Sequence, residues 1–115
     1  MQRIMLKSKI HRAVLTGTDL NYEGSIAIDS ALLEAADILP DEQVQVLNVN
    51  TGTRITTYAI AAERNSGIVM LNGPAARSGI AGDILVILTF VNLDADELAG
   101  YISKIVNVDE NNRLR

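Results

Sequence analysis

The apolar residues of this chain fall in short runs separated by turn signals, and this pattern restricts its fold more than any other feature. The runs are rich in Val, Ile and Thr, which is typical of β-strands. Helices longer than one turn are favoured at residues 30–37, with Asp29 as N-cap, and at residues 94–100. Because strands and helices do not alternate regularly, the pattern predicts a mainly β fold, a small closed β-barrel with a few short helices.

The expected strands lie at residues 3–15, 25–28, 43–50, 53–60, 68–72, 84–92 and 104–108. Several of them lack a clean alternation of apolar and polar residues, as expected where both faces are covered. A chain this small is expected to hide such surface by forming a symmetric homo-oligomer. One helical turn is expected at residues 75–77, and the tail 109–115 is expected to fray.

The chain has 115 residues, close to the commonest size of one domain, so we expect a single domain over residues 1–115. Apolar residues make up 48% and charged residues 21%, which can fill a core and excludes a disordered chain. The longest apolar run, Ile84 to Leu88, is far shorter than the roughly 20 residues of a membrane helix. The amino terminus has no signal-peptide core, so we expect no membrane partner and a cytoplasmic location.

Charge and composition also exclude several classes of function. A net charge of −4, with only three Tyr and one Phe, argues against a nucleic-acid partner. With no Cys and one His, a thiolate or structural zinc site is excluded. The acids Asp94, Asp96 and Glu97 stand at a helix start, where the helix dipole favours them without any metal.

The amino-terminal segment is basic. If residues 3–15 are extended, Lys7, Lys9 and His11 share one face of the strand, with Leu6 and Ile10 on the other. Such a face could form an anion pocket, although a solvated basic strand is the more common meaning of this pattern.

A hydrolytic site can be assembled on paper around one serine. Ser25 could join His11 with Asp19 or Glu23 in a triad, or Lys9 in a Ser-Lys dyad. No Gly-x-Ser-x-Gly elbow surrounds any serine, and no glycine-rich phosphate loop is present. Hydrolysis and phosphate chemistry are therefore not indicated.

The bond between Gly24 and Ser25 offers a different chemistry. A serine after glycine can attack the preceding carbonyl if the backbone is held strained, and glycine allows conformations that other residues cannot adopt. The resulting ester can eliminate to dehydroalanine, which hydrolyses to a pyruvoyl group. This reaction needs a donor for the transient oxyanion, and Thr57 and Asn72 are polar residues in otherwise apolar strands.

Several segments together resemble a known family. They are Lys9 to Arg12, Tyr22 to Ser25, Arg54, Thr57 to Arg64, and Asn72 to Ala76. In this order they closely resemble the aspartate 1-decarboxylases, the bacterial pyruvoyl enzymes that make β-alanine for pantothenate biosynthesis. The resemblance runs without a gap from Met1 to about Val91.

The resemblance implies a six-stranded double-psi β-barrel and a homotetramer whose active sites lie between subunits. It implies self-cleavage into a β chain, residues 1–24, and an α chain, residues 25–115, whose first residue becomes the pyruvoyl cofactor. The implied substrate is L-aspartate, which binds the ketone as a Schiff base and loses CO₂. Whether maturation needs a partner protein stays open.

The resemblance also implies roles for individual residues. The processing group comprises Gly24, Ser25, Thr57 and Asn72. The substrate-binding group comprises Lys9, Arg54, Thr57, Gly73, Pro74 and Ala75. Tyr58 is the implied proton donor beside the catalytic Ser25, His11 and Tyr22 are supporting residues, and no metal ligand is implied. The residue types suit these roles, because a guanidinium matches a carboxylate and a tyrosine hydroxyl can protonate carbon.

Two positions depart from the family pattern. Leu47 stands where the family often has an aromatic residue that walls the pocket, and Pro74 stands where alanine often follows Gly73. Two other functions stay open: an unprocessed homologue that acts as a binding or regulatory barrel, and a decarboxylase of another acidic amino acid, which the missing pocket aromatic makes worth testing.

Overall fold

The computed structural model describes residues 1–115 and is mainly β, as predicted. The strands are β1 (Gln2–Val14), β2 (Gly17–Asp19), β3 (Ser25–Asp29), β4 (Gln43–Asn48), β5 (Arg54–Ala62), β6 (Val69–Asn72), β7 (Ile84–Asp94) and β8 (Lys104–Asn107). The helices are α1 (Ser30–Ala36) and two short 3-10 helices, η1 (Gly73–Ser78) and η2 (Ala95–Glu97). No helix is both long and apolar enough to span a membrane.

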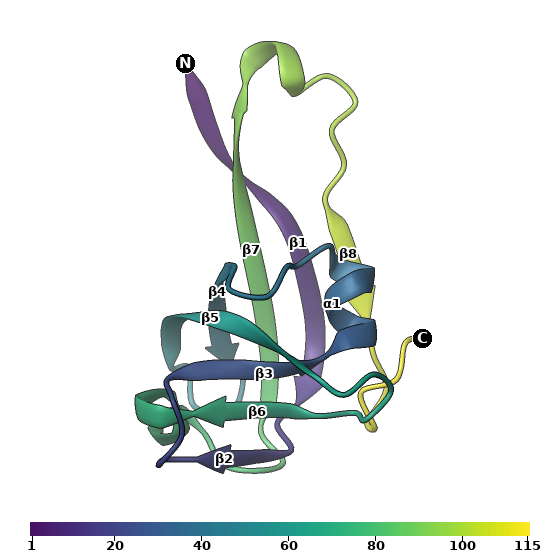
Figure 1. Ribbon diagram of the computed structural model, residues 1–115. Coiled ribbons are helices and arrows are strands. Elements are labelled where there is room, and N and C mark those ends of the chain that lie inside the picture. The colour runs from purple at the N-terminus through teal and green to yellow at the C-terminus, as the bar shows by residue number, and fades with distance from the viewer.

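All strands belong to one sheet, in the order β2-β6-β3-β5-β4-β7-β1-β8 (Figure 1). This sheet has eight strands where the family resemblance implied six. The strand missed by the sequence pattern is β2, which has only three residues and no apolar alternation. Barrel closure and the double-psi connection stay predictions.

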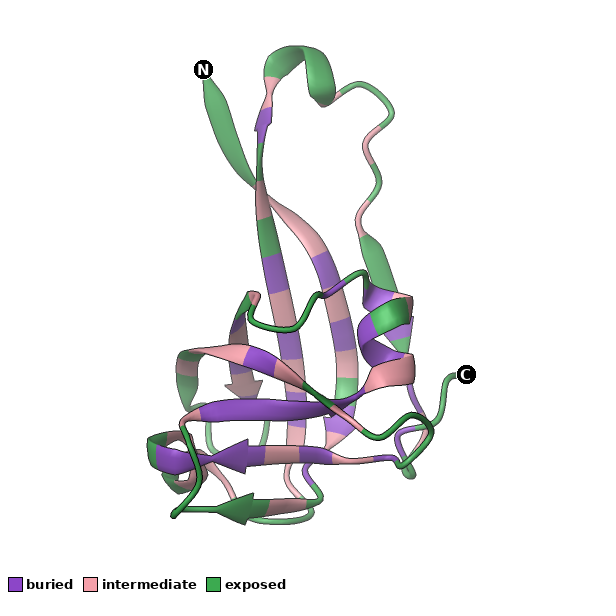
Figure 2. Cartoon of the chain, viewed as in Figure 1, coloured by how far each residue is buried: buried purple, intermediate pink, exposed green.

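The core lies where β3 crosses the body of the molecule. Every residue of β3 is buried (Figure 2). Ile26 and Ile28 of this strand pack in one apolar cluster with Ile10, Leu71 and Ile87. Such complete burial matches the near-continuous apolar run of β3 and its position between two strands, β5 and β6.

The helix α1 follows β3 directly, as predicted. The Asp29 side chain accepts a hydrogen bond from the Ala31 N–H at 2.8 Å and so caps the helix. Asp37 ends the helix in a left-handed conformation, with φ of 55°. Leu32 and Leu33 lie on the buried face of the helix.

The outer halves of β1 and β7 form a two-stranded arm that extends beyond the body (Figure 1). Ile4 in this arm is 76% exposed, and Phe90 is also exposed. Nearer the body, the ladder is irregular between Leu6 and Ser8. Lys7 lies at this irregularity, and its Nζ binds Glu42 Oε2 at 2.7 Å and the Asp37 carbonyl oxygen at 2.6 Å. Lys7 is therefore engaged in a salt bridge and is not available to the proposed anion pocket.

The prediction that the tail 109–115 frays is wrong. Asn112 is 1% exposed and binds both the N–H and the carbonyl of Val14, at 2.7 and 2.8 Å. It also donates to the Gly67 carbonyl at 2.9 Å, and Val108 forms a β-bridge with Leu114. The side-chain amide of Asn112 thus pairs with the Val14 backbone as a neighbouring strand would, and hydropathy patterns do not detect such a contact.

Candidate active site

Ser25 begins β3 and is 1% exposed. Its Oγ accepts a hydrogen bond from Asn72 Nδ2 at 3.2 Å and donates one to the Glu23 carbonyl oxygen at 3.3 Å. Antiparallel pairing of β3 with β6 places Ser25 directly opposite Asn72. The contact thus depends on the register of the sheet, and a slip by one residue would break it.

Gly73 confines the backbone of Gly24, the residue that precedes Ser25. Its φ is +65°, and a Cβ at this position would lie 2.7 Å from Gly24 Cα and 2.9 Å from the Tyr22 carbonyl oxygen. Only glycine allows this approach of two backbones. A Cβ on Gly24 would lie 3.4 Å from Pro74 Cδ, so the chain before Ser25 is packed against the start of η1.

A pocket of about 310 Å³ lies beside Gly24. The expected site residues that line it are Gly24, Thr57, Pro74 and Ala75. The structure therefore brings residues from the loop before β3, from β5 and from η1 to one place.

Three further residues line this pocket and were missed: Ile55, Thr56 and Ser78. The two-residue period of a strand could have added Ile55 to Thr57. The three-residue period of a 3-10 helix could have added Ser78 to Ala75. None of the lining side chains is charged.

Asn72 is buried, and its Oδ1 has no hydrogen-bond partner. A buried acceptor without a donor costs about 1–3 kcal/mol and is rare in folded proteins. The structure thus keeps a free acceptor next to the Ser25 hydroxyl.

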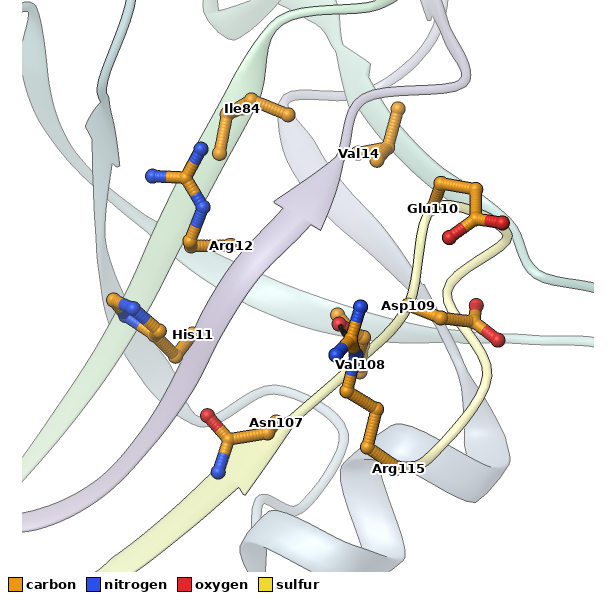
Figure 3. Close-up of a pocket in the computed structure, with 9 residues that line it drawn as sticks. All are labelled: His11, Arg12, Val14, Ile84, Asn107, Val108, Asp109, Glu110 and Arg115. Atoms are coloured by element: carbon orange, nitrogen blue, oxygen red, sulfur yellow. Dashed lines mark hydrogen bonds between the residues drawn. The ribbon is translucent and has the colours of Figure 1, made fainter.

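The basic residues Lys9 and His11 lie on β1 and are not part of the pocket beside Gly24. In the sheet, β5, β4 and β7 separate their strand, β1, from β3. His11 lines a different pocket, of about 570 Å³, together with Arg12, Asn107 and Arg115 (Figure 3). Its Nδ1 is buried and has no partner. Neither Lys9 nor His11 lines the pocket beside Gly24.

Arg54, Tyr58 and Tyr22 are also absent from that lining. Arg54 and Tyr58 belong to the same strand as the lining residues Ile55, Thr56 and Thr57. Tyr22 lies on the loop before β3 and is 54% exposed. Within one chain, none of these cationic and tyrosine side chains lines the Gly24 pocket.

The other end of β3 is fixed by the carboxylate of Asp29. Burial alone would raise the pKa of Asp29, but hydrogen bonds from the backbone N–H groups of Gly67, Ala31 and Asn65 outweigh it and hold the pKa below its usual range. Asp29 is therefore an anion that ties the start of α1 to the loop before β6, which ends at Asn72.

The hydrolytic alternatives find no support in this geometry. The hydrogen-bond partners of Ser25 Oγ are Asn72 and the Glu23 backbone, not His11, Lys9 or Asp19. The acids Asp94, Asp96 and Glu97 do cluster at the tip of the arm. They are exposed, and Asp94 and Glu97 form the capping box of η2, which accounts for their proximity.

Comparison with known proteins gives one result throughout. The family model described as aspartate decarboxylase matches residues 1–115. The aspartate 1-decarboxylase of Thermoanaerobacter pseudethanolicus is 55% identical over 98% of this chain and 97% of its own length. That of Methylobacillus flagellatus is 55% identical over 100% and 91%, and that of Syntrophus aciditrophicus is 52% identical over 100% and 99%. The chain belongs to the aspartate decarboxylase family.

Proposed function

We propose that the chain is the proenzyme of an aspartate 1-decarboxylase, which cleaves itself between Gly24 and Ser25 and then converts L-aspartate to β-alanine and CO₂. Membership of the family supports the reaction. The observation that carries the self-cleavage is the buried Ser25 hydroxyl, bonded to Asn72 beside a Gly24 that Gly73 confines.

The cleavage balances without any outside reagent except water. Ser25 Oγ attacks the Gly24 carbonyl carbon, the C–N bond breaks, and the hydroxyl proton passes to the released amine, which leaves an ester. Loss of the Ser25 Cα proton expels the Gly24 carboxylate and leaves dehydroalanine. The dehydroalanine tautomerises to an imine, and water hydrolyses the imine to a ketone with release of ammonia. The products are residues 1–24 and residues 25–115 with an amino-terminal pyruvoyl group.

The residues around Ser25 suit this sequence of steps. Asn72 Nδ2 orients the lone pairs of Oγ, and the contact between Gly73 and Gly24 limits the freedom of the carbonyl. Thr57 lines the same pocket as Gly24, and its hydroxyl is the donor we assign to the negative charge that develops on the Gly24 oxygen.

The site also fits the pyruvoyl group that would replace Ser25. The position is buried, it adjoins a pocket at Gly24, and the free Oδ1 of Asn72 lies beside it. When formed, the group supplies an electron-withdrawing ketone that takes up the electrons left by departing CO₂.

The chain's own residues bind and protonate the substrate in this proposal. Arg54 and Lys9 hold the carboxylates, since charge-assisted hydrogen bonds are the strongest available. Tyr58 supplies the proton to carbon. Thr57, Gly73, Pro74 and Ala75 form the binding wall, while His11 and Tyr22 support the charged groups.

This assignment requires more than one copy of the chain. The pocket beside Gly24 has no charged lining residue, and Lys9 lies on a strand separated from β3. We therefore propose that another subunit of a homotetramer supplies the cationic side chains. The exposed apolar residues of the β1/β7 arm, Ile4 and Phe90, favour such an association.

Denaturing mass spectrometry of the purified full-length protein tests the cleavage, and release of CO₂ and β-alanine from L-aspartate tests the reaction. We expect two fragments that meet at Gly24 and Ser25, with turnover of aspartate. A full-length chain without turnover would instead support an unprocessed binding barrel. Faster turnover of glutamate than of aspartate would reassign the substrate.

A further inference from the structure

Asn48 is a buried polar residue outside the groups assigned so far. It ends β4 and is 3% exposed. Its Oδ1 accepts from the N–H groups of Asn50 and Thr51 at 2.9 and 3.2 Å. Its Nδ2 donates to the Ser78 carbonyl oxygen at 3.1 Å and to Asp83 Oδ2 at 2.9 Å. One side chain thus connects the turn after β4, the end of η1 and the turn before β7.

The surroundings of this amide are tightly packed. Asp83 Oδ2 also accepts from the Ile80 N–H at 3.0 Å, and the hydrogen bonds from Asn48 and Ile80 lower the pKa of Asp83. A Cβ on Gly79 would lie 3.0 Å from Asn48 Nδ2. The absence of a Cβ at position 79 thus leaves the Asn48 amide the space in which it reaches its two acceptors.

These contacts fix the far end of the pocket wall. At its start, η1 is held by the approach of Gly73 to Gly24. At its end, η1 is held by the bond from Asn48 to the carbonyl of Ser78, and Ser78 itself lines the pocket beside Gly24. The last carbonyls of a helix have no partner within the helix, so this bond also satisfies a group that would otherwise turn toward water.

Building on the proposed function, we infer that Asn48 is a positioning residue for the substrate. Its hydrogen bond to the Ser78 carbonyl sets the position of Ser78 in the pocket that Thr57 also lines. Loss of that bond lets the end of η1 move and widens the pocket, while Gly73 still holds the Gly24–Ser25 link. The effect therefore falls on aspartate binding rather than on self-cleavage.

Four variants test this inference in the full-length protein. Asn48→Asp removes both donors and places a second carboxylate beside Asp83. Asp83→Asn keeps an oxygen acceptor for Asn48. The double variant combines Asn48→Asp with Asp83→Asn. In it, the amide at position 83 can donate to the carboxylate at position 48, but the Ser78 carbonyl still lacks its donor. Asn50→Asp is the matched control, because it adds the same charge nearby and keeps the acceptor for the Ile84 N–H.

We expect Asn48→Asp to raise KM for aspartate about fivefold, as loss of one hydrogen bond can do, with a smaller change in kcat and a lower Tm. The double variant should recover Tm but keep the raised KM, whereas Asp83→Asn and Asn50→Asp should keep the original KM.

An unchanged KM in Asn48→Asp, or a KM that recovers together with Tm in the double variant, overturns the inference and leaves Asn48 a structural residue. Wild-type protein that does not decarboxylate aspartate would instead overturn the proposed function.

Discussion

Asn72 Nδ2 lies 3.2 Å from Ser25 Oγ, and the two residues face each other across adjacent antiparallel strands. The donor is on the side chain, and the sheet register places it, so the nucleophile is oriented by the fold itself. The partner oxygen of the same amide is buried without a donor. The amide of Asn72 therefore contacts the one hydroxyl that must react through its donor.

Asn72→Ala tests the importance of that donor. Without it, the Ser25 hydroxyl keeps only its bond to the Glu23 carbonyl, and we expect cleavage to slow by roughly tenfold, as loss of one hydrogen bond can do. The fraction of cleaved chain over time, measured by intact-protein mass spectrometry, gives the rate. Cleavage at the original rate would show that the orientation of Ser25 does not depend on Asn72.

Ser25→Ala removes the nucleophile and should abolish both cleavage and decarboxylation, with the fold retained because a buried hydroxyl gives way to a methyl group. Ser66→Ala is a suitable control, since that hydroxyl accepts only the Ile68 N–H on the surface. The readouts are fragment masses and CO₂ release. Cleavage of Ser25→Ala at the same bond would require a nucleophile from elsewhere.

Gly73→Ala should prevent cleavage by displacing the Gly24 backbone, which a Cβ would approach to 2.7 Å. Gly52→Ala provides the comparison, because Gly52 also has positive φ, +77°, but has open space around its Cα. Both variants carry the cost of a left-handed alanine, about 1 kcal/mol. We expect this backbone cost to lower Tm by a similar amount in both variants. Gly73→Ala alone should lower Tm further and lose cleavage. Equal behaviour of the two would mean that the contact with Gly24 is not needed.

Tyr58→Phe should keep self-cleavage and lose most decarboxylation, because it removes the proposed proton donor but no residue of the processing group. Tyr101→Phe is a matched change on another tyrosine, whose hydroxyl donates to the Leu6 carbonyl. Full-length and cleaved masses report processing, and β-alanine formation reports turnover. Normal turnover by Tyr58→Phe would assign the proton to water or to another acid.

Much of this architecture could be predicted from the sequence, because its causes are local. Asp29 before an apolar helix and the runs on β4, β5 and β7 are short-range patterns, and the structure confirms them. The short strand β2 and the ordered tail could not be found in this way. Both depend on partners far along the chain, as the contact of Asn112 with Val14 shows.

The candidate site also contains some residues that could be predicted from the sequence and some that could not. Strand pairing and η1 bring four of the expected residues together within one chain: Gly24, Thr57, Pro74 and Ala75. Sequence order places Lys9 and His11 near the site, but pairing of β1 with β7 and β8 puts them in another part of the sheet. Asn48 was missed because its hydrogen-bond partners, Ser78 and Asp83, lie far along the chain.

The stability of the fold should depend on pH through Asp29. Its pKa is lowered in the folded state from an ordinary value near 3.8, so the folded chain binds this proton less readily than the unfolded chain. The stabilisation is therefore complete above about pH 4 and disappears as pH falls through the lower folded pKa.

At pH 7, we expect Asp29→Asn to reduce the free energy of unfolding by about 1–3 kcal/mol, because one amide oxygen replaces a carboxylate that accepts three backbone N–H groups. Urea unfolding at pH 7 and pH 3 measures the difference between wild type and variant, which should narrow at pH 3. Asp96→Asn, on an exposed residue of η2, should leave the free energy nearly unchanged at both pH values. A constant difference for Asp29→Asn would mean that the variant acts through packing, and that the charge of Asp29 does not hold the end of β3.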